Sequence, residues 1–433
     1  MCAAEATSSR ARVKRARRPV WGRLSAGLIT GAADDDPSGI ATYSQVGAAY
    51  GYGTLWSVFA ALPLMIGIQS VCARIGRVTG KGVGANIRAQ YGCAFAYPLV
   101  LALVIANVIN LGADIGAMGA ALKLLIGGPA LLYVAAFAVL STALQVYVPF
   151  SYYSPMLKVL TLSLFAYVAA VFVIRVPWLD VFKDGLLPHV SFDGKYAVAI
   201  VAVFGTTISP YLFFWQAAQE VEEVNDPGNA RRPLKRKPSQ SKDALQRIRI
   251  DTVSGMLISE AVAFFIILTA AVVLHAHGRT DINSSAQAAA ALRPLAGPFA
   301  STLFAAGIVG TGLLAVPILA GSAAFGTAEA FGRPCSLARR PSQAKLFYCT
   351  LVMAGVLGLA LNLTPINPIK ALYWSAVING VAAVPIMIVI MLLGANPRVM
   401  GQFALPRGLK ILGWLATAVM AAAAIVMFAT WGR

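Results

Sequence analysis

Apolar runs of about 20 residues recur along the whole chain, and they are the strongest constraint on its fold. Of the 433 residues, 58% are hydrophobic and 12% are charged, whereas a soluble domain carries about 25% charged residues. Inside a bilayer every backbone polar group needs an internal partner, so such runs favour helices. The sequence therefore predicts an all-α polytopic membrane protein. A soluble fold would have to bury an implausible amount of apolar surface.

Eleven candidate spans follow from these runs. They are residues 22–48, 52–75, 95–126, 129–148, 153–175, 196–220, 250–275, 296–327, 345–363, 367–394 and 408–430. Most Lys and Arg residues fall in alternate connections, starting with the basic arm at 1–21. The positive-inside rule then predicts a cytoplasmic N-terminus and an external C-terminus. The net charge of +18 thus reflects orientation in the lipid bilayer and does not indicate nucleic-acid binding.

The chain lacks the arrangements typical of enzymes and of structural metal sites. Its five cysteines are scattered and form no C-x-x-C pair. His189, His275 and His277 fall in predicted outer loops. No H-E-x-x-H motif and no large soluble domain are present. The sequence predicts neither an enzyme nor a bound cofactor.

Two spans are interrupted by small polar residues followed by proline. The first contains "ADDDPSG" at residues 33–39, and the sixth contains "FGTTISPYLFF" at residues 204–214. Proline removes a backbone donor and disfavours helix in the residue before it. Such breaks survive at membrane depth where they are buried or line a cavity. Two ordinary proline kinks are the alternative, but kinks leave the three aspartates unexplained.

The spacing of the breaks predicts an inverted repeat. They lie five spans apart, so equivalent helices of two five-span halves run in opposite directions. The first half then covers residues 22–175 and the second covers 176–395, with an extra helix within 396–433. The second half includes a polar cytoplasmic loop at 222–249, predicted to be flexible. A solvated loop without a specific role is favoured over contact with lipid headgroups. Broken helices that meet near the midplane favour a cation site beside Asp36.

Over residues 22–430 the chain resembles the Nramp family of divalent-metal transporters, which have the LeuT-type fold. The family motif D-P-G-N is matched by Asp36-Pro37-Ser38-Gly39, and M-P-H is matched by Ser209-Pro210-Tyr211. The stretches "GAAYGYGTLW" and "ARIGRVTGKG" are also similar to the family. The resemblance implies that Asp36 binds metal and that a backbone carbonyl near Thr206 assists it.

Several ligand positions depart from the family pattern. The family's Asn falls on Gly39, its Met thioether on Ser209 and its His on Tyr211. An acidic proton acceptor falls on Leu111, while a second acidic position is matched by Asp114. A tenth-helix Gln falls on Ala376, one turn before Asn379. The metal would thus be bound without sulfur or imidazole.

These departures predict a site for a hard divalent cation. Asp36, Thr206 or Thr207, Ser209 and backbone carbonyls supply oxygen, and Gly39 leaves room for water. Such a site suits partly hydrated Mg²⁺, and Mn²⁺ accepts similar ligands. The departures also resemble a divergent, bacterial Nramp-related branch that includes Mg²⁺ transporters, which implies a Mg²⁺ substrate and a plasma-membrane location. Because two proton-relay positions are altered, the sequence predicts uptake by alternating access without proton coupling. The alternatives are a proton-coupled Mn²⁺/Fe²⁺ symporter, a non-transporting metal-binding relative and a transporter of organic substrates.

Further polar residues lie within the predicted spans. Asp34 and Asp35 are candidates for an acidic vestibule that concentrates cations. Asp114 and Glu260 are intramembrane acids, which are either functional or matched by a structural partner. Asn379 either supports the ligands or links helices, and Tyr211 lies beside the second break. The sequence leaves the oligomeric state open, and a monomer is compatible with it.

Overall fold

The computed structural model describes residues 30–31, 33–148, 162–186, 191, 193–225 and 231–431. In this part of the chain all regular secondary structure is helical, as the hydropathy predicts. The α-helices up to the second break are α2 (Pro37–Tyr50), α3 (Trp56–Thr79), α4 (Val83–Tyr91), α5 (Cys93–Ile126), α6 (Ala130–Tyr147), α8 (Phe165–Val173), α9 (Trp178–Leu186) and α10 (Gly194–Thr207). The later ones are α11 (Pro210–Asn225), α12 (Ser241–Val273), α13 (Ser285–Ala289), α14 (Arg293–Ala296), α15 (Ala300–Ala330), α16 (Lys345–Leu361), α17 (Pro368–Ala395), α18 (Pro397–Met400) and α19 (Arg407–Ala429).

Within these residues, eight helical segments are long and apolar enough to cross a membrane, counting α10 and α11 together. They coincide with eight of the eleven predicted spans, and the shorter apolar helix α16 coincides with the ninth. The first span is described only from residue 30 onward. Much of the fifth, residues 153–161, lies outside the described residues. The chain is a multi-pass helical membrane protein.

Both predicted helix breaks are present. Residues 33–34 are helical, but Asp36 is extended, with φ −70° and ψ 172°, and α2 begins at Pro37. In the sixth span α10 ends at Thr207, Ile208 has φ −106° and ψ 58°, and α11 begins at Pro210. In each case proline occupies the first turn of a helix, where its missing N–H costs nothing. The helical backbone is thus interrupted at two buried points.

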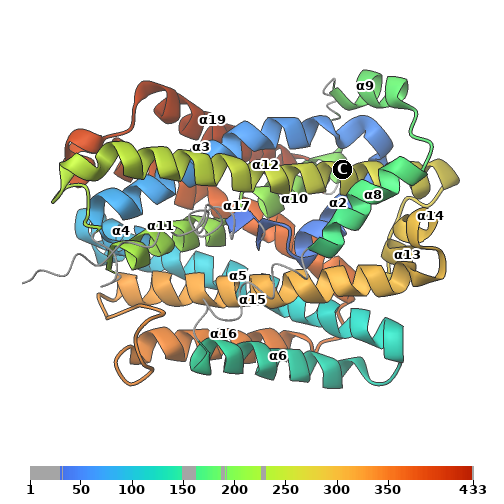
Figure 1. Cartoon of the computed structure of the whole chain (residues 1–433), viewed down its shortest axis with the longest axis horizontal. Helices are drawn as coiled ribbons and strands as arrows, with labels where there is room; N and C mark the ends of the chain where they lie inside the picture. Colours follow the sequence, from blue (N-terminus) through green and yellow to red (C-terminus); the bar gives the residue numbers. More distant parts are fainter. Residues whose placement is uncertain are drawn as a thin grey trace, which may run out of the picture.

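The broken helices lie in the middle of the bundle (Figure 1). Helix α2 packs against α10, α12 and α17, and α15 packs along α5. Helices α6 and α16 pack together along the lower edge of Figure 1. Helix α6 is mostly exposed, as a lipid-facing helix should be, whereas the α10–α11 segment is almost wholly buried. This arrangement shields both breaks from lipid.

Close approach of α10 to α17 depends on Gly205. A Cβ at this position would meet the carbonyl oxygen of Ala376 and would lie 2.6 Å from the amide nitrogen of Gly380. Small residues allow such contact between helix backbones in membranes. We expect Gly205→Ala to destabilise the protein by about 1–3 kcal/mol, through overpacking. Thermal unfolding in detergent measures this. Gly408→Ala is the control, because a Cβ there meets nothing within 4 Å, and an equal loss in both variants would contradict the packing argument.

The predicted flexible loop at 222–249 differs from the structure in its described part. Helix α11 continues to Asn225, and α12 begins at Ser241, nine residues before the predicted span. Between them, the amides of Leu234 and Lys235 donate hydrogen bonds to the carbonyls of Arg77 and Val78 at the end of α3. Hydropathy registers only the apolar part of a helix, so it missed the polar turns that extend beyond the membrane.

Candidate functional site

The Asp36 carboxylate lies at the first helix break and is 1% exposed. Its Oδ1 accepts hydrogen bonds from the Ser38 hydroxyl at 2.6 Å and the Gly39 amide at 2.8 Å. Its Oδ2 accepts from Asn110 Nδ2 at 2.9 Å and from the Tyr211 hydroxyl at 3.4 Å. Burial of a charged group is tolerated when its oxygens are paired in this way. The donors fix the carboxylate toward the centre of the bundle.

Asn110 is the residue that the sequence argument missed. It stands on α5, and its side-chain oxygen accepts a hydrogen bond of 2.7 Å from Ser375 on α17. Its amide thus links Asp36 to a helix of the other predicted repeat. A signal was available, because Asn107, Asn110 and Asp114 recur at helical spacing in an apolar span.

The second break places its polar atoms opposite the first. The Ser38 and Thr206 hydroxyls are 3.4 Å apart and join the two breaks. The Ser209 hydroxyl donates to the carbonyls of Gly205 and Thr206, at 2.6 and 2.8 Å. The Thr207 hydroxyl instead contacts Tyr43 of α2 at 2.9 Å. Of the predicted oxygen donors, Thr206 is therefore joined to Asp36 through Ser38, whereas Ser209 bonds carbonyls of its own break.

Gly39 lines the space between the breaks. A Cβ on Gly39 would lie 3.3 Å from both the Thr206 hydroxyl and the Asp34 carbonyl. Any larger side chain at this position would point at the second break. Tyr211 hydrogen-bonds the Ala33 carbonyl at 2.9 Å as well as Asp36, so it joins α11 to the end of the first half-helix. Predicted residues Gly39 and Tyr211 thus belong to the same buried cluster.

Asp34, Asp35 and Glu260 form a second buried group. The Asp34 carboxylate accepts a hydrogen bond of 2.6 Å from Ser259 on α12. Asp35 and Glu260 are near enough for their charges to interact, and each is 3% exposed. Neither oxygen of Glu260 has a hydrogen-bond partner among the described residues. These carboxylates lie inside the bundle, between the first break and α12.

The remaining predicted residues are also buried. Asp114 stands one turn after Asn110 on α5 and interacts electrostatically with Asp36. Asn379 is fully buried on α17, and its side chain makes no hydrogen bond within the described part of the chain. Leu111 faces α16, where it packs against Gly358. No three His, Cys, Asp or Glu side chains among the described residues converge to hold a metal. The polar atoms that the structure brings together at the breaks are carboxylate, hydroxyl and carbonyl oxygens.

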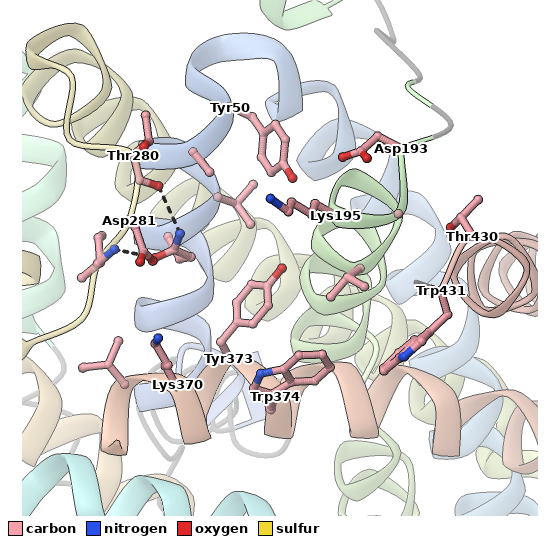
Figure 2. A pocket seen from close by; sticks show the side chains of 17 residues that line it. Tyr50, Asp193, Lys195, Thr280, Asp281, Lys370, Tyr373, Trp374, Thr430 and Trp431 are labelled. Atoms are coloured by element: carbon pink, nitrogen blue, oxygen red, sulfur yellow. Dashed lines mark hydrogen bonds between the residues drawn. The ribbon is translucent and has the colours of Figure 1, made fainter. Parts of the chain in front are cut away.

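A cavity of about 920 Å³ opens beyond the far end of α2, at the start of α10 and α17 (Figure 2). Tyr50, Lys195 and Tyr373 line it, and Figure 2 labels further aromatic and charged side chains around it. The carboxamide of Gln45 bonds the Thr280 carbonyl and the Ile282 amide at its wall. Gln45 is nine residues after Asp36, about 13 Å along a helix. The site residues do not line this cavity, so helix packing separates it from the breaks.

Comparison with known proteins identifies the family. The profile of the family described as "Natural resistance-associated macrophage protein-like", Nramp, matches residues 27–430. The divalent metal cation transporter MntH of Klebsiella pneumoniae (strain 342) is 26% identical over 423 residues, which cover 96% of this chain and 95% of the relative. The MntH of Chromohalobacter salexigens is 28% identical over 296 residues, covering 66% of this chain and 65% of the relative.

Solved structures with the same fold were also found. A manganese transporter of Eremococcus coleocola, in complex with an aromatic bis-isothiourea substituted compound, has a TM-score of 0.71, 18% identity and coverage of 93% of this chain and 85% of that one. The nucleobase-cation-symport transporter Mhp1 has a TM-score of 0.53 with 15% identity, covering 95% and 93%. These similarities confirm the LeuT-type fold that the family resemblance implies. The family match over nearly the whole length shows that the chain belongs to the Nramp family.

Proposed function

We propose that this protein transports divalent metal cations, Mg²⁺ and Mn²⁺, across the bacterial plasma membrane by alternating access and without proton coupling. The observation that carries the proposal is the approach of the two breaks. The Ser38 hydroxyl donates to Asp36 and lies 3.4 Å from the Thr206 hydroxyl, and the Ser209 hydroxyl bonds the Thr206 carbonyl. These donors are hard oxygen atoms, and one carboxylate with several neutral oxygens suits a cation that keeps part of its water shell. The relatives named as divalent metal cation and manganese transporters support a divalent substrate.

The absence of proton coupling is inferred from two positions. Leu111 packs against α16 and carries no proton, and Tyr211 is a neutral phenol that donates to the Ala33 carbonyl. Neither can act as the relay that the family resemblance implies. Membrane potential suffices as a driving force, because a dication gains about 4.6 kcal/mol per 100 mV from an inside-negative potential.

Proteoliposomes that contain a metal-sensitive and a pH-sensitive dye test the function. We expect Mg²⁺ and Mn²⁺ influx that rises with an inside-negative potential and leaves internal pH unchanged. Acidification in proportion to metal influx would overturn the uncoupled mechanism. Binding of Mg²⁺ without influx would indicate a non-transporting relative. Influx of amino acids but not of metals would indicate an organic substrate.

A proton-coupled Mn²⁺ transporter is the second candidate. Relatives that cover almost the whole chain carry the name of a divalent metal cation transporter, and a structural neighbour is a manganese transporter. The same dye experiment separates the two candidates, since a coupled transporter acidifies the vesicle interior and prefers Mn²⁺ to Mg²⁺.

Replacing Ser209 with cysteine exchanges one oxygen atom for sulfur and tests whether this side chain contributes to the ion site. Sulfur is a soft ligand, so we expect Ser209→Cys to increase the inhibition of Mg²⁺ influx by Cd²⁺ at least about tenfold. Inhibition curves of flux against Cd²⁺ concentration measure this. The control is Ser322→Cys, since Ser322 is equally buried but hydrogen-bonds Asn107 on α5. Equal sensitivity of both variants would contradict the assignment of Ser209 to the ion site.

A further inference from the structure

A second cavity lies away from the ion site, at the end of α6. It has a volume of about 190 Å³ and lies between α6, α11, α15 and the segment that leads into α16. Arg339, Arg340 and Gln145 supply its polar lining, and Trp215 and Tyr348 supply aromatic walls. The volume is adequate for a small polar headgroup and too small for a folded partner.

The two arginines bring positive charge to the wall of the cavity. Neither forms a close ion pair with another described residue, although the Glu222 carboxylate is near enough to interact with the charge of Arg339. Their segment has a defined conformation, because the Tyr348 hydroxyl donates a hydrogen bond of 2.8 Å to the Arg339 carbonyl. Adjacent guanidinium groups on a held segment match the several oxygens of a phosphate group.

Gln145 adds a buried acceptor to the same cavity. Its side-chain nitrogen donates a hydrogen bond of 3.0 Å to the Ser141 carbonyl, while its Oε1 has no hydrogen-bond partner in the described part of the chain. Gln145 is 8% exposed. A buried acceptor without a donor is unfavourable, so a ligand with a hydroxyl group would satisfy it.

The surroundings of the cavity are those of a membrane interface. Helix α6 is largely exposed, with Val139 at 66% and Tyr147 at 83%. Tyrosine is enriched where the bilayer meets water. Arg339 and Arg340 belong to a basic connection that the positive-inside rule assigns to the cytoplasm, where anionic lipids attract basic pockets between helices.

We propose that this cavity binds the headgroup of an anionic phospholipid, with phosphatidylglycerol as the best chemical match. Arg339 and Arg340 hold the phosphate, and Gln145 accepts a hydrogen bond from a headgroup hydroxyl. The bound lipid contacts Trp215, which lies on the half-helix α11 that starts at the second break. Trp215 also packs against Gly321 of α15, so an occupied cavity stabilises this arrangement of α11.

Lipid binding to the purified full-length protein in neutral detergent tests the proposal. Short-chain phosphatidylglycerol is titrated and thermal unfolding is followed, with phosphatidylcholine and glycerol 3-phosphate as parallel probes. We expect stabilisation by phosphatidylglycerol alone. R339Q/R340Q should weaken apparent binding about 30-fold, because each basic side chain contributes about fivefold near an anionic headgroup. The matched control R407Q/K410Q removes two charges from the start of α19 and should bind as the native protein does.

Q145L provides a second test that leaves the arginines in place and decides the matter if R339Q/R340Q does not fold. It should remove the preference for phosphatidylglycerol over phosphatidic acid, which lacks the glycerol hydroxyls. Equal stabilisation by phosphatidylcholine, or undiminished binding in both variants, would overturn the proposal. Equal stabilisation by glycerol 3-phosphate would assign the cavity to a free phosphate compound instead. None of these results depends on metal transport.

Discussion

Asp36→Asn abolishes metal influx in proteoliposomes, with a loss of at least about 100-fold, or about 3 kcal/mol. The substitution keeps the size of the side chain but removes its negative charge. It also replaces one of the two carboxylate oxygens with an NH₂ group. The donors on Gly39, Asn110 and Tyr211 are then left with one acceptor atom in place of two. A cation at the breaks then loses the carboxylate that stands at the first break, and with it a large part of its electrostatic attraction.

The matched control for this variant is Asp243→Asn. Asp243 is exposed in the first turn of α12, far from both breaks. The same chemical change should leave flux within about twofold of the native protein, as expected for a surface position. Metal influx by folded Asp36→Asn protein at the native rate would refute the assignment of Asp36 as the cation ligand.

Asn110→Leu weakens binding of Mg²⁺ by about 10- to 100-fold, which is the usual cost of removing a group that orients a metal ligand. Leucine fills a similar volume but cannot donate to Asp36 Oδ2 or accept from Ser375. The carboxylate then keeps only the 3.4 Å contact with Tyr211 on that oxygen. Calorimetric titration of the folded protein with Mg²⁺ measures the effect.

Asn107→Leu separates orientation of the ligand from general stability. Asn107 lies one turn earlier on α5 and donates to the Leu319 carbonyl and to Ser322 on α15. Its replacement should lower the unfolding temperature while the folded protein binds Mg²⁺ with native affinity. Equal loss of affinity in both variants would mean that Asn110 acts through helix packing and not through Asp36.

Fold class followed from sequence for a physical reason. A bilayer accepts long apolar helices, so hydropathy located eight spans that the structure describes and the apolar helix α16. Proline within a polar interruption located both breaks, because its missing N–H acts locally and needs no tertiary contact. The boundaries were less accurate: α12 begins nine residues before the predicted span, since its first turns lie outside the apolar region.

The partners within the site did not follow from sequence. Asp36 was expected to face a cation, but its link to Asn110 and on to Ser375 joins residues 74 and then 265 positions apart. Gly39 and Thr206, which lie close together at the two breaks, are likewise far apart in the sequence. Asp34 and Asp35 were candidates for a vestibule. In the structure Asp34 accepts a hydrogen bond from Ser259, and Asp35 lies near Glu260, both on α12.

The sequence by itself determined that this protein crosses the membrane repeatedly, that two of its spans break, and that Asp36 stands at one break. These properties depend on local composition and backbone chemistry, which each segment carries with it. Only the tertiary structure decided which side chains meet at the breaks, because the direction of a side chain depends on how helices distant in sequence pack. Close packing at Gly205 brings α10 against α17, and the hydrogen bonds of Asn110 join α5 to both Asp36 and α17.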